Sequence, residues 1–224
     1  MIEQNIRIDD ILYADTGAEY PETLDFVNVF SQYTESMIGV PVTIVRYKIG
    51  IYEDCVAHRC LPAIAYGRRA CSHKFKHSPQ TTYIKAKYGQ DVEYYMFIGF
   101  DYDELGRMRE SEHKNVVNMF PLVEYKIGRK ECIKICNDNG FYPSKSSCWI
   151  CPSLKKREVL ELMKRGDGLI DRALELEYSA ELKSLRGLGR NWSWREIVER
   201  YRDQTRMFDE EDDIELDIKC TCWE

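Results

Sequence analysis

The chain has 224 residues, of which 44% are hydrophobic, so it can bury a substantial core and a disordered chain is not expected. No apolar run approaches the ~20 residues that span a bilayer, and the amino terminus lacks the basic and apolar regions of a signal peptide, so we expect a cytoplasmic protein without a membrane partner. The net charge of -6 comes largely from an acidic run at 209–217, which we expect to be a solvated tail.

The first part of the chain has the pattern of a strand, a helix and a second strand. A short apolar run at 8–14 predicts a strand that leads into a loop at 15–17. Pro21 and Glu22 suit the first turn of a helix, and the run at 40–45 predicts the next strand. This spacing is typical of a βαβ unit in a parallel sheet.

The middle of the chain continues the alternation. Runs rich in β-forming residues predict strands at 92–100 and 119–125, with a polar loop at 101–114 between them. A helix is expected at 130–139, closed by Gly140.

The last third of the chain is predicted to be helical. Helical periodicity runs from 154 to 185 with an interruption at 166–168, and Ser193 and Glu196 form a capping box that starts a last helix. We therefore expect an α/β core with a cysteine metal site at 1–153, a helical region at 154–208 and an acidic tail at 209–224.

The nine cysteines are the strongest chemical signal in the sequence. Without a secretory signal they are expected to be free thiols or metal ligands. Cys148 and Cys151 form a C-x-x-C turn, a spacing that lets two thiolates reach one metal ion, while Cys132, Cys136 and Cys71 are candidates for further ligands. A thioredoxin-like redox use of the pair remains an alternative. The residues alone do not separate zinc from an iron–sulfur cluster.

Four stretches, in this order, resemble motifs of the phosphoadenosine phosphosulfate (PAPS) reductase family, a branch of the adenine-nucleotide alpha-hydrolase-like fold. Residues 11–23 are similar to its strand and D-T-G-x-x-x-P-E-T turn, and residues 71–79 to its C-x-x-x-x-K-x-x-P segment. Residues 121–125 are similar to P-L-x-E-W, and residues 145–152 match K-S-x-C-x-x-C-P, both signatures of phage and bacterial members.

The resemblance implies a Rossmann-like, doubly wound parallel sheet with a helical carboxyl-terminal region. The family's phosphate-binding S-G-G-x-D-S loop and the strand before it are not found in the sequence, so the expectation is a sheet without its first strand and a late start at Met1 or a split gene. The resemblance also implies a [4Fe-4S] cluster on Cys71, Cys148 and Cys151, with Cys132 as the fourth ligand and Cys136 in reserve. Zinc is the alternative metal.

The implied substrate is an adenine nucleotide or sulfonucleotide, and basic residues suit its anionic groups. The residues expected to bind it are Asp15, Thr16, Gly17, Arg69, Lys74 and Lys76.

The implied activity is that of an oxidoreductase or sulfurtransferase, with no catalytic residue assigned. The tail lacks the catalytic Cys-Gly motif of true sulfonucleotide reductases, so reduction of PAPS itself is not expected. The alternative is a non-catalytic or partner-dependent subunit with a structural zinc site. Expected partners are a chain carrying the missing loop, or a second copy of this chain. Nucleic acid is a further candidate, as the target of modification in the DNA phosphorothioation branch.

Overall fold

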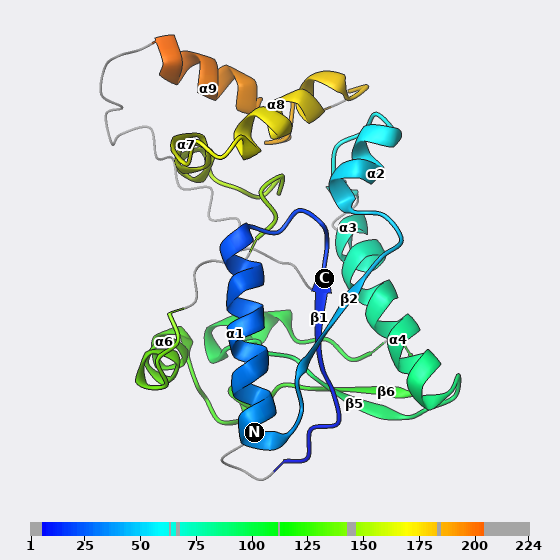
Figure 1. Cartoon of the computed structure of the whole chain (residues 1–224). Helices are drawn as coiled ribbons and strands as arrows, with labels where there is room; N and C mark the ends of the chain where they lie inside the picture. Colours follow the sequence, from blue (N-terminus) through cyan, green and yellow to red (C-terminus); the bar gives the residue numbers. More distant parts are fainter. Residues whose placement is uncertain are drawn as a thin grey trace.

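The computed structural model describes residues 6–62, 64–65, 68–111, 113–142, 147–182 and 185–203. Strands and helices alternate in its first part, and the last part is helical (Figure 1). The protein is therefore a mixed α/β structure, as the sequence predicts. None of the helices in these ranges is both long and apolar enough to cross a bilayer. The predicted acidic tail lies outside the described residues.

The predicted strand–helix–strand unit is confirmed. Strand β1 (Ile11–Asp15) is followed by helix α1 (Pro21–Ile38) and strand β2 (Val42–Arg46), and the two strands pair in parallel along their whole length. Pro21 starts the helix because its missing N–H would have no partner there, and Gly39 ends it in the left-handed conformation, with φ of 72°.

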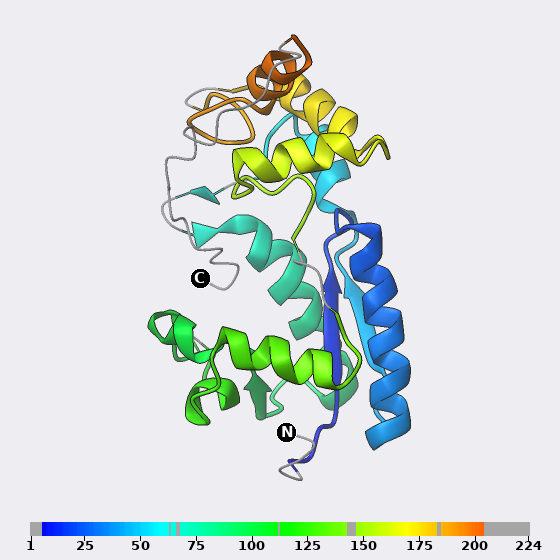
Figure 2. The same cartoon turned by 90° about the vertical axis from the view of Figure 1, so that its left-hand side faces the viewer.

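A second helical stretch follows β2 and covers the sheet. Helix α2 (Ile51–Ala57) precedes a short antiparallel hairpin of β3 (Ile64–Ala65) and β4 (Arg68–Arg69). The chain then runs without a break through α3 (Ala70–Ser72), the π-helical segment η2 (His73–His77) and α4 (Ser78–Tyr88). Helices α1 and α4 lie on opposite sides of the β1–β2 pair (Figures 1 and 2).

The next pair of strands corrects one prediction. Strand β5 (Tyr94–Phe97) pairs in parallel with β6 (Val116–Met119), and the 3₁₀ segment η3 (Tyr102–Arg107) lies in the loop between them. The strand expected at 119–125 is wrong, because Pro121 cannot donate a ladder hydrogen bond and instead opens the short helix α5 (Pro121–Glu124). Helix α6 (Arg129–Asp138) follows, with Gly140 beyond its end at φ of 77°.

The two parallel pairs are separate sheets. Strand β1 pairs only with β2, and β5 only with β6, among the residues that the structure describes. Figure 1 shows β5 and β6 running across the base of the molecule, away from the direction of β1. A complete doubly wound sheet is therefore not present in this part of the chain.

The break predicted at 166–168 is confirmed, but the second helix ends at Ser179, before the expected residue 185. Helices α7 (Lys156–Lys164) and α8 (Leu169–Ser179) are separated by Gly166 and Gly168, with φ of 69° and 79°. Helix α9 (Trp194–Asp203) begins after Ser193, whose hydroxyl accepts a hydrogen bond from the Glu196 N–H at 3.4 Å, one of the two bonds of the predicted capping box.

One hydrophobic core joins the α/β part to the helical part. It contains Ala18 from the loop after β1, Trp149 from the C-x-x-C turn, Val159 from α7 and Trp194 from α9. The boundary expected at residue 153 thus falls inside a shared core. Figures 1 and 2 show α2, α7, α8 and α9 gathered beyond the carboxyl end of β1.

Candidate functional site

The loop after β1 is held in place by its own residues and by the loop after β2. The buried Asp15 carboxylate accepts a hydrogen bond from the Gly17 N–H at 2.7 Å and from Arg46 Nε at 3.0 Å. Gly17 has φ of 79°, and a Cβ there would lie 2.8 Å from the Gly50 Cα. Only glycine therefore fits at this crossing of the two loops. Asp15 and Gly17 were both predicted to bind nucleotide. In the structure Asp15 holds the loop through its hydrogen bonds, and Gly17 allows the close approach of the two loops.

The C-x-x-C turn docks on the same loop. Cys148 forms an antiparallel bridge with Glu19, and the Trp149 N–H donates to the Ala18 carbonyl at 2.9 Å. The turn is closed by a hydrogen bond from the Cys151 N–H to the Cys148 carbonyl at 3.0 Å. Because Trp149 is only 2% exposed, burial of its ring anchors the turn to the core.

A small polar cluster surrounds the Cys148 thiol. The Thr16 hydroxyl donates to Glu19 Oε1 at 3.0 Å, and its oxygen lies 3.1 Å from Cys148 Sγ. Cys148 Sγ is 3.7 Å from the same carboxylate oxygen of Glu19, to which the thiol donates. The structure therefore joins Thr16, which was predicted as a nucleotide-binding residue, to Cys148, which was predicted as a metal ligand.

Electrostatics at this cluster favour the protonated thiol. Burial raises the pKa of Cys148 well above its ordinary value, and the nearby Glu19 carboxylate raises the pKa further. Lys76 and the hydrogen bond with Thr16 act in the opposite direction. A thiol binds metal as the thiolate, so a metal ion at Cys148 would have to displace this proton.

The two lysines of the basic segment have different surroundings. Lys74 Nζ lies 2.7 and 2.8 Å from the carboxylate oxygens of Asp54 and 5.4 Å from the centre of the Tyr47 ring. The pKa of Lys74 is raised, first by its hydrogen bond with Asp54. Lys76 instead lies near enough to Cys148 for its positive charge to lower the pKa of that thiol.

The other predicted residues are spread more widely. Cys71 in α3 packs against the same core as the C-x-x-C pair and lies close to Cys55. Cys132 lies on α6, where burial and then Asp101 raise its pKa while Arg129 lowers it. Arg69 lies in β4, and its side chain is outside the described part of the structure.

The cysteines do not form a complete metal site in the described ranges. No group of three or more His, Cys, Asp or Glu side chains is close enough there to hold a metal ion. Cys148 and Cys151 share one turn, and Cys71 packs against the same hydrophobic core. The set of Cys71, Cys148, Cys151 and Cys132, with Cys136 in reserve, remains a prediction.

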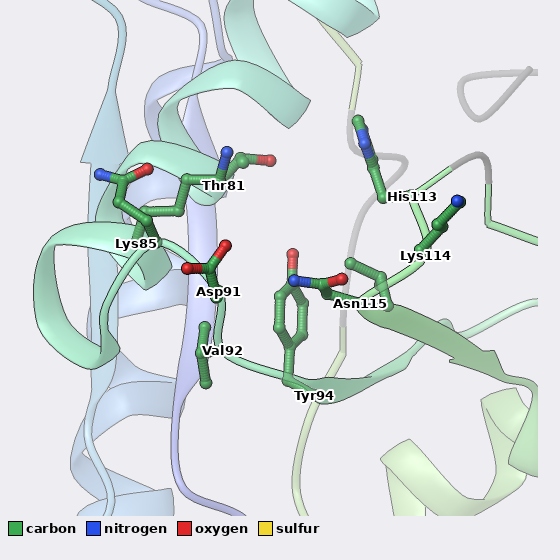
Figure 3. A pocket seen from close by; sticks show the side chains of 10 residues that line it. Thr81, Lys85, Asp91, Val92, Tyr94, His113, Lys114 and Asn115 are labelled. Carbon is green, nitrogen blue, oxygen red and sulfur yellow. The ribbon is translucent and has the colours of Figure 1, made fainter.

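A polar pocket of about 300 Å³ lies elsewhere, between α4 and the β5–β6 pair (Figure 3). Thr81 and Lys85 line it from α4, and Tyr94, His113 and Lys114 line it from the other side. It opens at the amino ends of β5 and β6, whereas doubly wound sheets bind ligands at the carboxyl ends of their strands. We therefore do not place the nucleotide in it.

Comparison with models of known protein families and with curated proteins finds no match for this chain. The candidate site is thus defined by its residues and geometry.

Glu19 is the residue of this site that the motifs did not single out. It lies in the turn between Gly17 and Pro21, where the sequence alone predicts an exposed carboxylate. Its contact with Cys148 spans 129 positions of the chain, so no local pattern indicates it. The only sequence feature that could have indicated its role is the position of an acidic residue beside the loop after β1.

Proposed function

We propose that this chain acts in adenine-nucleotide-dependent sulfur chemistry of the PAPS reductase type, as an oxidoreductase or sulfurtransferase with a cysteine-ligated iron–sulfur cluster. The observation that carries the proposal is the contact of Thr16 and Glu19 with Cys148 at the carboxyl end of β1. In doubly wound sheets this end of the strands is where ligands bind. The two motifs with the clearest family resemblance therefore meet where a substrate would be held.

A doubly wound sheet completed by a further strand is part of this proposal. In the order 3-2-1-4-5, strands β2 and β1 would be the third and second, and β5 and β6 the fourth and fifth. The strand that would join the two pairs would come from another polypeptide with the phosphate-binding loop, or from a rearrangement with a second copy. Size-exclusion chromatography and an ATP titration of the chain test this part, and a monomer with micromolar ATP affinity would contradict it.

Lys76 is the proposed contact for the anionic group of the substrate. Its positive charge acts on the Cys148 thiol of the C-x-x-C turn, where it lowers the pKa. Lys76→Ala should weaken binding of a sulfated or phosphorylated adenine nucleotide about tenfold, in line with the loss of one charge-assisted hydrogen bond of about 1.5 kcal/mol. Lys156→Ala on the exposed start of α7 is the matched control. Equal affinity in both variants would remove Lys76 from the site.

The metal part of the proposal is tested on protein purified without oxygen. A bound [4Fe-4S] cluster would supply electron transfer or sulfur activation, and Cys148, Cys151 and Cys71 would hold it. We expect a brown protein with iron and sulfide, and loss of both in Cys148→Ser. Cys132→Ser decides the fourth ligand, and Cys60→Ser on the exposed surface is the control. Full metal content in Cys148→Ser would refute the site.

A structural zinc site in a non-catalytic subunit is the second candidate. The observation that favours it is the burial of the C-x-x-C turn, where Ile150 is 0% exposed and the Leu154 N–H donates to the Cys151 carbonyl at 3.0 Å. A closed site of this kind is typical of structural zinc. Colourless protein with one zinc ion per chain, stabilised by the metal, would favour this function over the first.

A further inference from the structure

Helix α2 ends in a turn that brings two cysteines together. Its cap residue is His58, and the next residue, Arg59, has φ of 49° in the left-handed region. The Cys60 N–H donates to the Cys55 carbonyl at 3.0 Å, and the Arg59 N–H donates to the Val56 carbonyl at 3.1 Å. These two bonds define a Schellman motif, the six-residue turn that commonly closes a helix.

In a Schellman motif the side chains of the first and last residues commonly touch. Here both of these residues are cysteines, and Cys60 lies near enough to Cys55 to raise the pKa of its thiol, after the larger effect of burial. Cys55 is 3% exposed and faces the core, while Cys60 is exposed to solvent. The backbone hydrogen bond between the two residues holds the ends of the turn together, and a disulfide requires such a close approach of the two backbones.

We propose that Cys55 and Cys60 are a reversible dithiol that forms a disulfide when the protein meets a small-molecule disulfide such as oxidised glutathione. The exposed Cys60 thiolate attacks one sulfur of glutathione disulfide and releases one glutathione thiolate. The Cys55 thiol then loses its proton, attacks the Cys60 sulfur and releases the second glutathione. The two cysteines together lose two electrons and two protons, and one glutathione disulfide becomes two glutathione molecules.

The turn that holds Cys55 and Cys60 also contacts two other parts of the molecule. The Arg59 carbonyl accepts a hydrogen bond from the Glu181 N–H at 2.7 Å, and the two side chains form an ion pair at 3.1 Å. The turn therefore tethers α2 to the segment after α8. Cys55 is also a neighbour of Cys71, so oxidation would change the surroundings of that thiol. The inference concerns residues outside the proposed metal site and does not depend on a metal there.

The sequence offers a direct test by peptide mapping, because trypsin cleaves after Lys48, Arg59, Arg68 and Arg69. The reduced full-length chain is equilibrated with glutathione at a series of ratios, quenched with acid, alkylated, digested and analysed by mass spectrometry. The expected product is peptide 49–59 linked to peptide 60–68, two hydrogen atoms lighter than their sum and split by a reductant.

Folding should favour the link, because it raises the effective concentration of one thiol at the other. We expect the folded chain to form it at a ratio at least about tenfold more reducing than the chain in denaturant requires. Cys60→Ser should abolish the link, and Cys132→Ser should leave it unchanged. Equal ratios in the folded and unfolded chain would overturn the proposal. So would Cys60 recovered only as a glutathione adduct, or Cys55 linked to the Cys71 peptide.

Discussion

Replacement of Glu177 by glutamine should destabilise the helical region strongly. Its carboxylate is 3% exposed and accepts hydrogen bonds from four groups around the start of α9. Oε2 accepts from the Leu188 N–H at 2.6 Å and the Trp194 N–H at 3.0 Å. Oε1 accepts from the Arg195 N–H at 3.1 Å and from the Ser193 hydroxyl. This one side chain therefore satisfies the backbone donors that a helix start leaves unpaired.

The magnitude follows from what glutamine cannot do. One of its terminal atoms is an NH₂ group, which fits best at the position of Oε1. There it would donate to the Ser193 hydroxyl, which can turn to accept, but it would leave the Arg195 N–H unpaired in a buried place. An unpaired buried donor costs about 1 to 3 kcal/mol, so Glu177→Gln should cost about 1 to 3 kcal/mol. That loss is a large fraction of the stability of a domain, about 5 to 15 kcal/mol.

Guanidinium unfolding followed by circular dichroism measures this loss as a lower midpoint at unchanged slope. Glu175→Gln is the matched control, because Glu175 is exposed on the same helix and should change stability by less than about 0.5 kcal/mol. If Glu177→Gln shifts the midpoint no more than Glu175→Gln does, the hydrogen-bond argument fails.

Two further predictions concern the loop after β1 and the start of α1. Gly17→Ala should lower the free energy of unfolding by about 2 to 4 kcal/mol, because the alanine would combine a positive φ with overlap against the Gly50 backbone. Gly39→Ala is the control: its φ is 72° but the space around it is open, so it should cost only about 1 kcal/mol. Similar losses in thermal unfolding of the two variants would show that the close approach has no effect. Arg165 binds both carboxylate oxygens of Glu22, at 2.6 and 3.0 Å, and this hydrogen bonding lowers the pKa of Glu22. The pair therefore stabilises the fold at a pH above the ordinary pKa of glutamate, and this stabilisation is lost as the pH falls through the lowered pKa. Glu22→Gln should thus lower the free energy of unfolding by about 0.5 kcal/mol at about pH 7 and not at all at about pH 2. A loss that is the same at both pH values would contradict this assignment.

Local sequence determined most of the secondary structure. The βαβ unit was predictable because apolar periodicity, a proline at the first helical turn and a glycine at the end act within a few residues. The breaks at Gly166 and Gly168 and the cap at Ser193 were predictable for the same reason. No strand forms at 119–125, although the segment is apolar, because Pro121 favours a helical turn and opens α5.

The amino-acid sequence by itself thus determined the α/β class, the C-x-x-C pair and the basic segment, because these depend on residue type and short spacing. Tertiary structure alone decided that the Cys148 thiol contacts Thr16 and Glu19, that Lys74 is held by Asp54, and that Cys132 lies on a helix beside Asp101. It also placed the C-x-x-C turn in a core shared with the last helices. The physical reason is that these contacts join segments far apart in the chain, where packing of the whole core sets which side chains meet.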